Sequence, residues 1–157
     1  MARTQRRTFV DGPITYDPIV SRRRRLFTAV ATLTADDTGA LCLFSTAAGY
    51  TYTLPTCERG LHFTFIVQTT ITSVGAKIMC ASGDFLVGTI LQGTDGTFTQ
   101  AAVTANGTTH VSWNGNGSTT GGIIGDYVEV VGLGNNQWVV YGQNTATGTE
   151  ATPFATS

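Results

Sequence analysis

The chain has 157 residues and a mass of 16.5 kDa, a size that suits one domain with a tail. Only 12% of the residues are charged and 41% are hydrophobic, and glycine and threonine are abundant, which argues against long helices and favours strands and turns. The net charge of -1 divides into +5 for residues 1–25 and -6 for the remainder. We therefore expect a basic arm joined to an acidic body.

Membrane insertion and secretion are not expected. No apolar run approaches the ~18 residues that a transmembrane helix needs, and the first 25 residues lack the apolar region of a signal peptide. The three cysteines (Cys42, Cys57 and Cys80) are odd in number and show no CxxC spacing. They predict buried thiols in a reduced intracellular protein, with one disulfide and a free thiol as the alternative.

Residues 1–25 consist of two arginine clusters on either side of the text FVDGPITYDPIV. Pro13 and Pro18 rule out a continuous helix, so an extended arm is predicted. Its apolar side chains are too many for a plain linker, and they indicate a segment that lies on another protein or on a neighbouring subunit. The candidate docking residues are Arg3, Arg6, Arg7, Phe9, Ile14, Tyr16, Ile19, Arg22, Arg23, Arg24 and Arg25.

The run SRRRRL, residues 21–26, is compatible with several partners. Arginines bind DNA or RNA by releasing counterions, and a short basic run also fits a nuclear signal. A membrane anchor would need an amphipathic helix or a lipidation motif, and neither is present. A guanidinium also binds carboxylates on a protein surface through two parallel hydrogen bonds. The apolar residues between the two clusters favour protein docking, so nucleic acid is not the expected partner.

The remainder alternates short strands with turns. Residues Leu61, Phe63, Phe65 and Val67 are predicted to face inward, as are Val128, Val130, Trp138 and Val140. Roughly ten-residue spacing predicts an all-β antiparallel β-sandwich or jelly roll over residues 26–142, with a flexible tail over 143–157. The absence of an exact repeat argues against a solenoid. Strands are expected at 26–34, 40–44, 50–54, 61–68, 71–74, 76–81, 85–91, 97–103, 109–113, 127–131 and 137–142.

Catalytic signatures are missing from the sequence. There is no GxSxG or phosphate-binding loop, and neither His62 nor His110 stands in the cysteine–acid context of a nucleophile motif. The scattered histidines and cysteines lack zinc spacing. Aspartates in predicted turns could suit calcium, but they are also the ordinary residues that hydrogen-bond a bent backbone. The sequence therefore predicts a non-enzymatic protein with no metal and no cofactor.

Aromatic residues offer an alternative function. Trp113 borders the glycine-rich stretch NGNGSTTGG, residues 114–122, and we expect it at the surface, where it could stack on a sugar ring. Trp138 follows the inward phase of its strand and is expected in the core.

Two stretches within about residues 30–142 resemble tailed-bacteriophage virion proteins, in particular small capsid decoration (cement) proteins: TLTADDTGALCLFSTAAGYTYTLPTCERGLHFTFIVQ and GDYVEVVGLGNNQWVVYG. Similar text also occurs in phage tail fibres and head fibres. The resemblance implies a β-sandwich or jelly-roll body without catalytic residues. It also implies a homotrimer on the outer capsid surface, made in the host cytoplasm.

From the resemblance and the basic arm together, we expect a structural virion protein that stabilises the shell by clamping neighbouring major capsid protein subunits. The alternative is a tail-fibre or head-fibre module that binds host surface glycans through Trp113. A third possibility is an arm that contacts the packaged genome through its arginines.

Overall fold

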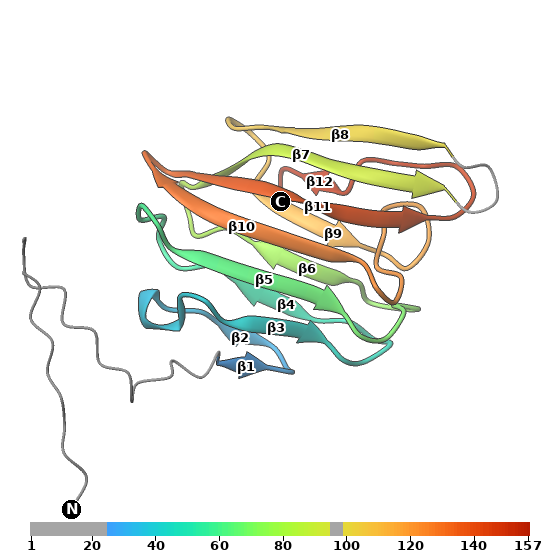
Figure 1. Ribbon diagram of the computed structural model, residues 1–157, viewed down its shortest axis with the longest axis horizontal. Coiled ribbons are helices and arrows are strands. Elements are labelled where there is room, and N and C mark those ends of the chain that lie inside the picture. Colours follow the sequence, from blue (N-terminus) through green and yellow to red (C-terminus); the bar gives the residue numbers. More distant parts are fainter. Residues whose placement is uncertain (1–24, 95–98) are drawn as a thin grey trace, which may run out of the picture.

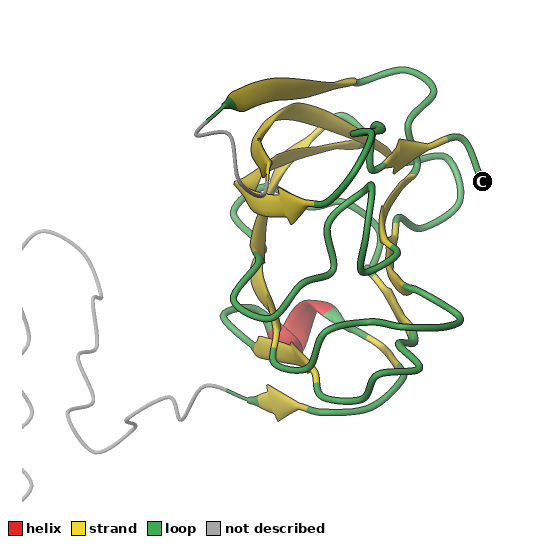
Figure 2. Ribbon diagram, turned by 90° about the vertical axis from the view of Figure 1, so that its right-hand side faces the viewer, coloured by secondary structure: helices red, strands yellow, loops and turns green. Residues whose placement is uncertain are grey.

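A computed structural model describes residues 25–94 and 99–157. Within these ranges the chain forms two facing β-sheets, which Figure 2 shows from the side as two layers. The larger sheet has seven strands in the order β1 (Leu26–Phe27), β3 (Leu41–Phe44), β5 (His62–Val67), β10 (Tyr127–Gly134), β11 (Gln137–Ala146), β7 (Phe85–Thr94) and β8 (Gln100–Asn106). The smaller sheet has five strands in the order β12 (Phe154–Ala155), β9 (Ser112–Gly115), β6 (Ala76–Met79), β4 (Thr51–Thr53) and β2 (Ala31–Thr32). The all-β sandwich predicted from the sequence is confirmed.

The first half of the chain winds as a flattened coil. From β1 to β6, successive strands alternate between the two sheets, so the strands within each sheet run parallel (Figure 1). The coils lie in register: Phe27, Cys42 and Phe65 are aligned in the larger sheet. Both sheets are consequently mixed, and antiparallel pairing is confined to the later strands. The coils have connecting loops of unequal length, so this half carries no sequence repeat although its strands pair in parallel.

One hairpin is inserted into the larger sheet. Strands β10 and β11 lie between β5 and β7, and β11 pairs in parallel with β7 over its whole length. Asn135 and Asn136 join them with φ of 54° and 60°. Positive φ at both central residues is the conformation of a two-residue hairpin turn whose twist matches that of the strands. This turn closes the hairpin between the strands that the sequence predicted at 127–131 and 137–142.

Three strand expectations need correction. Residues 26–34 divide into β1 and β2, because the chain passes from one sheet to the other between them. Residues 71–74 form a connection rather than a strand. The tail expected from residue 143 is instead structured: β11 continues to Ala146, and β12 pairs with β9. Phe154 is buried within β12, so one aromatic side chain fixes a segment whose composition looked like a linker.

The core lies between the sheets. The inward-facing residues predicted on β5, β10 and β11 are all buried, which confirms the phase of those strands. The Phe44 ring lies 5.2 Å from Tyr52 and 6.1 Å from Trp113, and the Phe63 ring lies 5.9 Å from Trp138. The three cysteines are buried and unpaired, and burial raises the pKa of Cys42 and Cys80 to about 12. These thiols are therefore protonated at neutral pH and serve as small apolar core groups.

Buried carboxylates hold loops to the sheets. Asp84 accepts a hydrogen bond from the backbone N–H of Cys57 at 2.7 Å. Asp126 accepts from the N–H groups of Gly122, Ile123 and Thr145 at 2.8, 3.0 and 2.8 Å. The interpretation of aspartates as residues that hydrogen-bond a bent backbone agrees with these contacts, since both carboxylates accept from backbone N–H groups.

We predict that Asp126→Ala lowers the free energy of unfolding by about 3 kcal/mol, because it leaves one buried and two partly buried N–H groups without this acceptor. Urea unfolding followed by tryptophan fluorescence measures the loss. The control is Glu150→Ala, which removes an exposed carboxylate and should change stability by less than about 0.5 kcal/mol. A loss for Asp126→Ala no larger than that of the control would contradict the role given to this carboxylate.

Candidate functional site

Catalytic groups do not converge in the part of the chain that the structure describes. Among the described residues, no group of three or more His, Cys, Asp or Glu side chains is placed to hold a metal ion. His62 is exposed on β5, whereas the His110 ring stacks on Phe154 with its centroid 5.8 Å away. His110 Nδ1 also accepts the backbone N–H of Asn106 at 3.1 Å. Among the described residues, no helix is long and apolar enough to span a membrane.

The base of the N-terminal arm is fixed at one edge of the larger sheet. The carbonyl of Arg25 accepts the N–H of Leu41 at 2.8 Å, and β1 follows immediately in parallel pairing with β3. The Arg25 guanidinium forms an ion pair with Asp37, although 62% of the Arg25 side chain is exposed. The other ten candidate docking residues lie outside the described residues. Arg25 thus has a partner within its own chain, which makes it the anchor of the arm.

Asp37 belongs to a short 3-10 helix, η1 (Ala35–Asp37), which begins at a capping box. Its Oδ2 accepts from both the backbone N–H and the hydroxyl of Thr34, each at 2.8 Å. Burial by itself would raise the pKa of Asp37, but the hydrogen bonds from Thr34 and the Arg25 guanidinium outweigh burial and hold the pKa below its ordinary value. The carboxylate is therefore charged at neutral pH and can attract Arg25.

The proposed sugar platform at Trp113 is wrong. The Trp113 side chain is 1% exposed and packs against Phe44 between the sheets. The glycine-rich loop after β9 folds over the body instead of leaving Trp113 at an edge. At Gly117, φ is 75° and an added Cβ would lie 1.7 Å from the carbonyl oxygen of Ile71, so the loop and the 71–74 connection touch through backbone.

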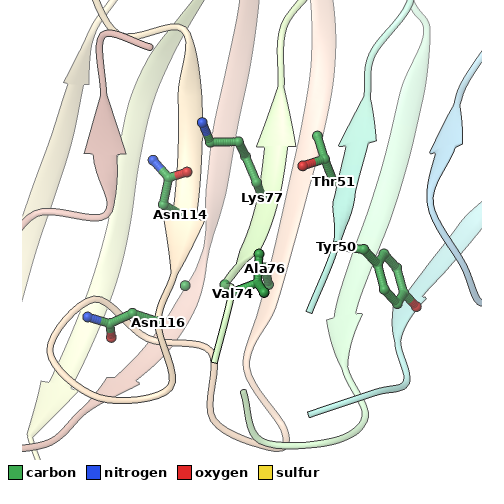
Figure 3. Close-up of a pocket in the computed structure, with 9 residues that line it drawn as sticks. Tyr50, Thr51, Val74, Ala76, Lys77, Asn114 and Asn116 are labelled. Atoms are coloured by element: carbon green, nitrogen blue, oxygen red, sulfur yellow. The ribbon is translucent and has the colours of Figure 1, made fainter. Parts of the chain in front are cut away.

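A shallow groove of about 290 Å³ lies on the outside of the smaller sheet, between β4 and β9 (Figure 3). Several of its polar side chains already bind groups within the chain. Lys77 Nζ donates to the carbonyl of Ser157 at 3.0 Å, and Asn114 Nδ2 donates to the hydroxyl of Ser112 at 3.1 Å. Asn116 Oδ1 accepts the N–H of Ser118 at 2.8 Å. The groove is therefore a poor candidate for a ligand site.

The outward side of the larger sheet is the most unusual surface in the described residues. We define the outer face by nine apolar side chains that alternate with core residues along the strands: Leu41, Leu43, Ile66, Val87, Leu91, Tyr127, Val131, Val139 and Tyr141. Leu91, Tyr127 and Tyr141 are 47%, 40% and 42% exposed. The alternation in residues 138–141 also indicated this face. If Trp138 and Val140 point into the core, the two residues Val139 and Tyr141 must point outward. Only the core residues were assigned from the sequence.

The body is less acidic at its surface than its composition suggests. Of the eight carboxylates after residue 25, Asp37, Asp84 and Asp126 are buried, and Asp95 lies outside the described residues. Among the described residues, Asp36, Glu58 and Glu150 are exposed and Glu129 is half-buried. The +5 arm therefore adjoins a nearly neutral surface, and an arginine cluster finds few carboxylates on its own body.

No family model, curated protein or solved structure matches the chain in comparisons of its sequence and fold.

The Arg25–Asp37 contact makes stability at the base of the arm depend on pH. Since the pKa of Asp37 is lower in the folded state, its contribution is present above the unfolded pKa and is lost as the pH falls through the folded value. We expect Asp37→Asn to lower the free energy of unfolding by about 1–2 kcal/mol at pH 7. The difference from the wild type should shrink as the pH falls below about 4.

Urea unfolding at pH 7 and at pH 3 measures both differences. Asp36→Asn is the matched control, because Asp36 is the exposed neighbour on the same 3-10 helix. A deficit for Asp37→Asn that is equally large at both pH values would show that packing, and not the charge, carries the contribution.

Proposed function

We propose that this chain is a structural, non-enzymatic virion protein of a tailed phage. In this proposal it binds the outer capsid surface as a homotrimer, and its N-terminal arm clamps neighbouring major capsid protein subunits. The observation that carries the proposal is an arm of net charge +5, rich in apolar residues, whose last residue is anchored by Asp37 at the edge of a rigid sandwich. The resemblance of the strand-and-turn text to capsid decoration proteins supports the same function.

Geometry suits a clamp at this position. Because β1 pairs with β3 directly after Arg25, the first described residue is tied to the sheet and any load on the arm passes into the sandwich. Twenty-four extended residues can span up to about 80 Å, enough to reach from one capsid subunit to the next. Arginine side chains bind carboxylates bidentately, and the apolar side chains between the clusters supply burial.

Because the contacts of the arm would be repeated over the capsid lattice, each single contact can be weak. A trimer brings three arms to one capsid position, so after the first arm binds, the others bind at high effective concentration. The polar loops and the hydroxyl-rich smaller sheet suit exposure to water. These features favour a capsid-bound protein over a glycan-binding fibre module, whose expected platform, Trp113, lies in the core.

The test is co-sedimentation of the purified protein with undecorated capsids of the phage that encodes it. Deleting residues 1–24 should weaken capsid binding at least tenfold, and retaining Arg25 keeps the anchor on Asp37 intact. Arg59→Gln is the control, because it removes an exposed arginine of the body without altering the arm. Undiminished binding by the truncated protein would overturn the role of the arm.

The same preparation separates capsid protein from genome as the target of the arm. Contact with DNA predicts strong binding of the purified chain to a DNA duplex, with affinity that falls steeply as salt rises. Docking on capsid protein predicts that binding to empty capsids survives nuclease treatment. Binding that requires packaged DNA would contradict the proposal and favour the genome-contacting arm.

A further inference from the structure

We infer that the outer face of the larger sheet packs against a second copy of this chain. The inference rests on the homo-oligomer in the proposed function and names the surface that forms it. Figure 1 looks onto this sheet, which lies in front of the smaller one.

The strand pattern itself points to burial on both sides. A sheet with one solvated face shows apolar residues alternating with polar ones, whereas a sheet covered on both faces shows nearly continuous apolar runs. β3 reads LCLF and β10 begins YVEVV, while residues 138–141 of β11 read WVVY. The inward residues of these runs fill the core, so the outward ones require another explanation.

Cross-strand register gathers the outward residues into rows. One row places Ile66 beside Tyr127, and Tyr127 lies opposite Gln143, which adjoins Leu91. A second row joins Val131 to Val139 and Val139 to Val87. A third row lies between these two and is more polar, with Thr64, Glu129, Tyr141 and Thr89. The outer face therefore gathers apolar side chains from four strands around a few polar ones, and such apolar patches with polar neighbours mark interaction sites on soluble proteins.

The smaller sheet supplies an internal comparison. Its outward rows read Thr51, Lys77 and Asn114, then Thr53, Met79 and Ser112. Apart from Met79, these are hydroxyl, amide and charged groups of the kind that a solvated face carries, and the buried hydroxyl of Ser112 donates to the backbone oxygen of Ser157. The same chain has thus built one water-facing sheet surface and one apolar sheet surface, so general hydrophobicity does not explain the outer face.

Charge favours a second copy as the occupant. Among the described residues, Glu129 is the one carboxylate in the rows of the outer face, and its hydrogen bond from the hydroxyl of Tyr141 raises the pKa of that tyrosine. Two such faces meet without strong self-repulsion, and charge depletion with exposed tyrosines is typical of interface cores. Residues 1–24 carry six arginines and would find one carboxylate partner here, which disfavours them as the cover.

The size of the surface also fits. With strands about 4.8 Å apart and about 3.3 Å per residue, the five strands that carry the outer face (β3, β5, β10, β11 and β7) present on the order of 600 Å² as a flat sheet. Side-chain relief adds to this flat area. Specific interfaces bury about 800 Å² per partner, so the outer face is close to one side of such an interface. Three sheets that turn this face toward a common axis would make a closed assembly.

The test is the oligomeric state of the full chain without capsids, measured by sedimentation equilibrium over a hundredfold range of concentration. Leu91→Lys and Tyr141→Lys place a charge on the outer face and should each weaken self-association at least tenfold. The matched control is Thr53→Lys, which places the same charge on the outside of the smaller sheet and should leave self-association unchanged. Circular dichroism establishes that each variant is folded.

A second measurement, hydroxyl-radical labelling, uses the wild-type chain alone. Tyr127 and Tyr141 should be protected from hydroxyl-radical labelling at concentrations where the chain is associated, and should be labelled after dilution. An oligomer of any stoichiometry that the face variants dissociate supports the inference. A monomer with labelled tyrosines overturns it and leaves the face for capsid protein, while a monomer with protected tyrosines overturns it in favour of cover by residues 1–24.

These outcomes are separable from failure of the proposed function. Self-association is measured without capsids, whereas the function is measured by co-sedimentation with them. A chain that associates through the outer face but does not bind capsids would support the inference and contradict the function.

Discussion

Burial of one face of each sheet against the other is the constraint on which the structure depends. Phe44, Tyr52 and Trp113 form one aromatic group in this layer, and Phe63 packs on Trp138 in another. Neither sheet could be stable alone, since each would expose these rings to water. The winding of the first half, the inserted hairpin and the return of the C-terminal segment are different ways in which the chain covers the same core.

Backbone hydrogen bonds set the second constraint. A chain that repeatedly crosses between sheets leaves N–H groups in its connections, and buried donors need acceptors. Asp37, Asp84 and Asp126 provide them from positions close to the core. This use of carboxylates lowers the surface charge of the body, and it is the physical reason that the composition overstates how acidic the surface is. The capsid-binding proposal therefore assigns the arginines a partner outside the chain.

Local alternation allowed the strand phases to be predicted. Residues 61–67 and 127–131 alternate clearly, so Phe63, Phe65 and Val128 could be placed inward without a structure. Strand order could not be derived, because parallel pairing of β1, β3 and β5 depends on loops whose lengths differ and whose sequences carry no repeat. Trp113 was misplaced because a neighbouring glycine-rich stretch resembles an exposed loop, although that loop packs on the body through Gly117.

The outer face was implied by the same alternation, but recognising it required the register that aligns Tyr127, Tyr141 and Leu91 across different strands. The most direct test of the whole account is a cryo-EM map of the virion that is proposed to contain this protein. The account predicts sandwich density on the outside of the shell, with residues 1–24 on major capsid protein and the outer face buried between copies. Density inside the shell, or a single copy whose outer face is bare, would contradict it.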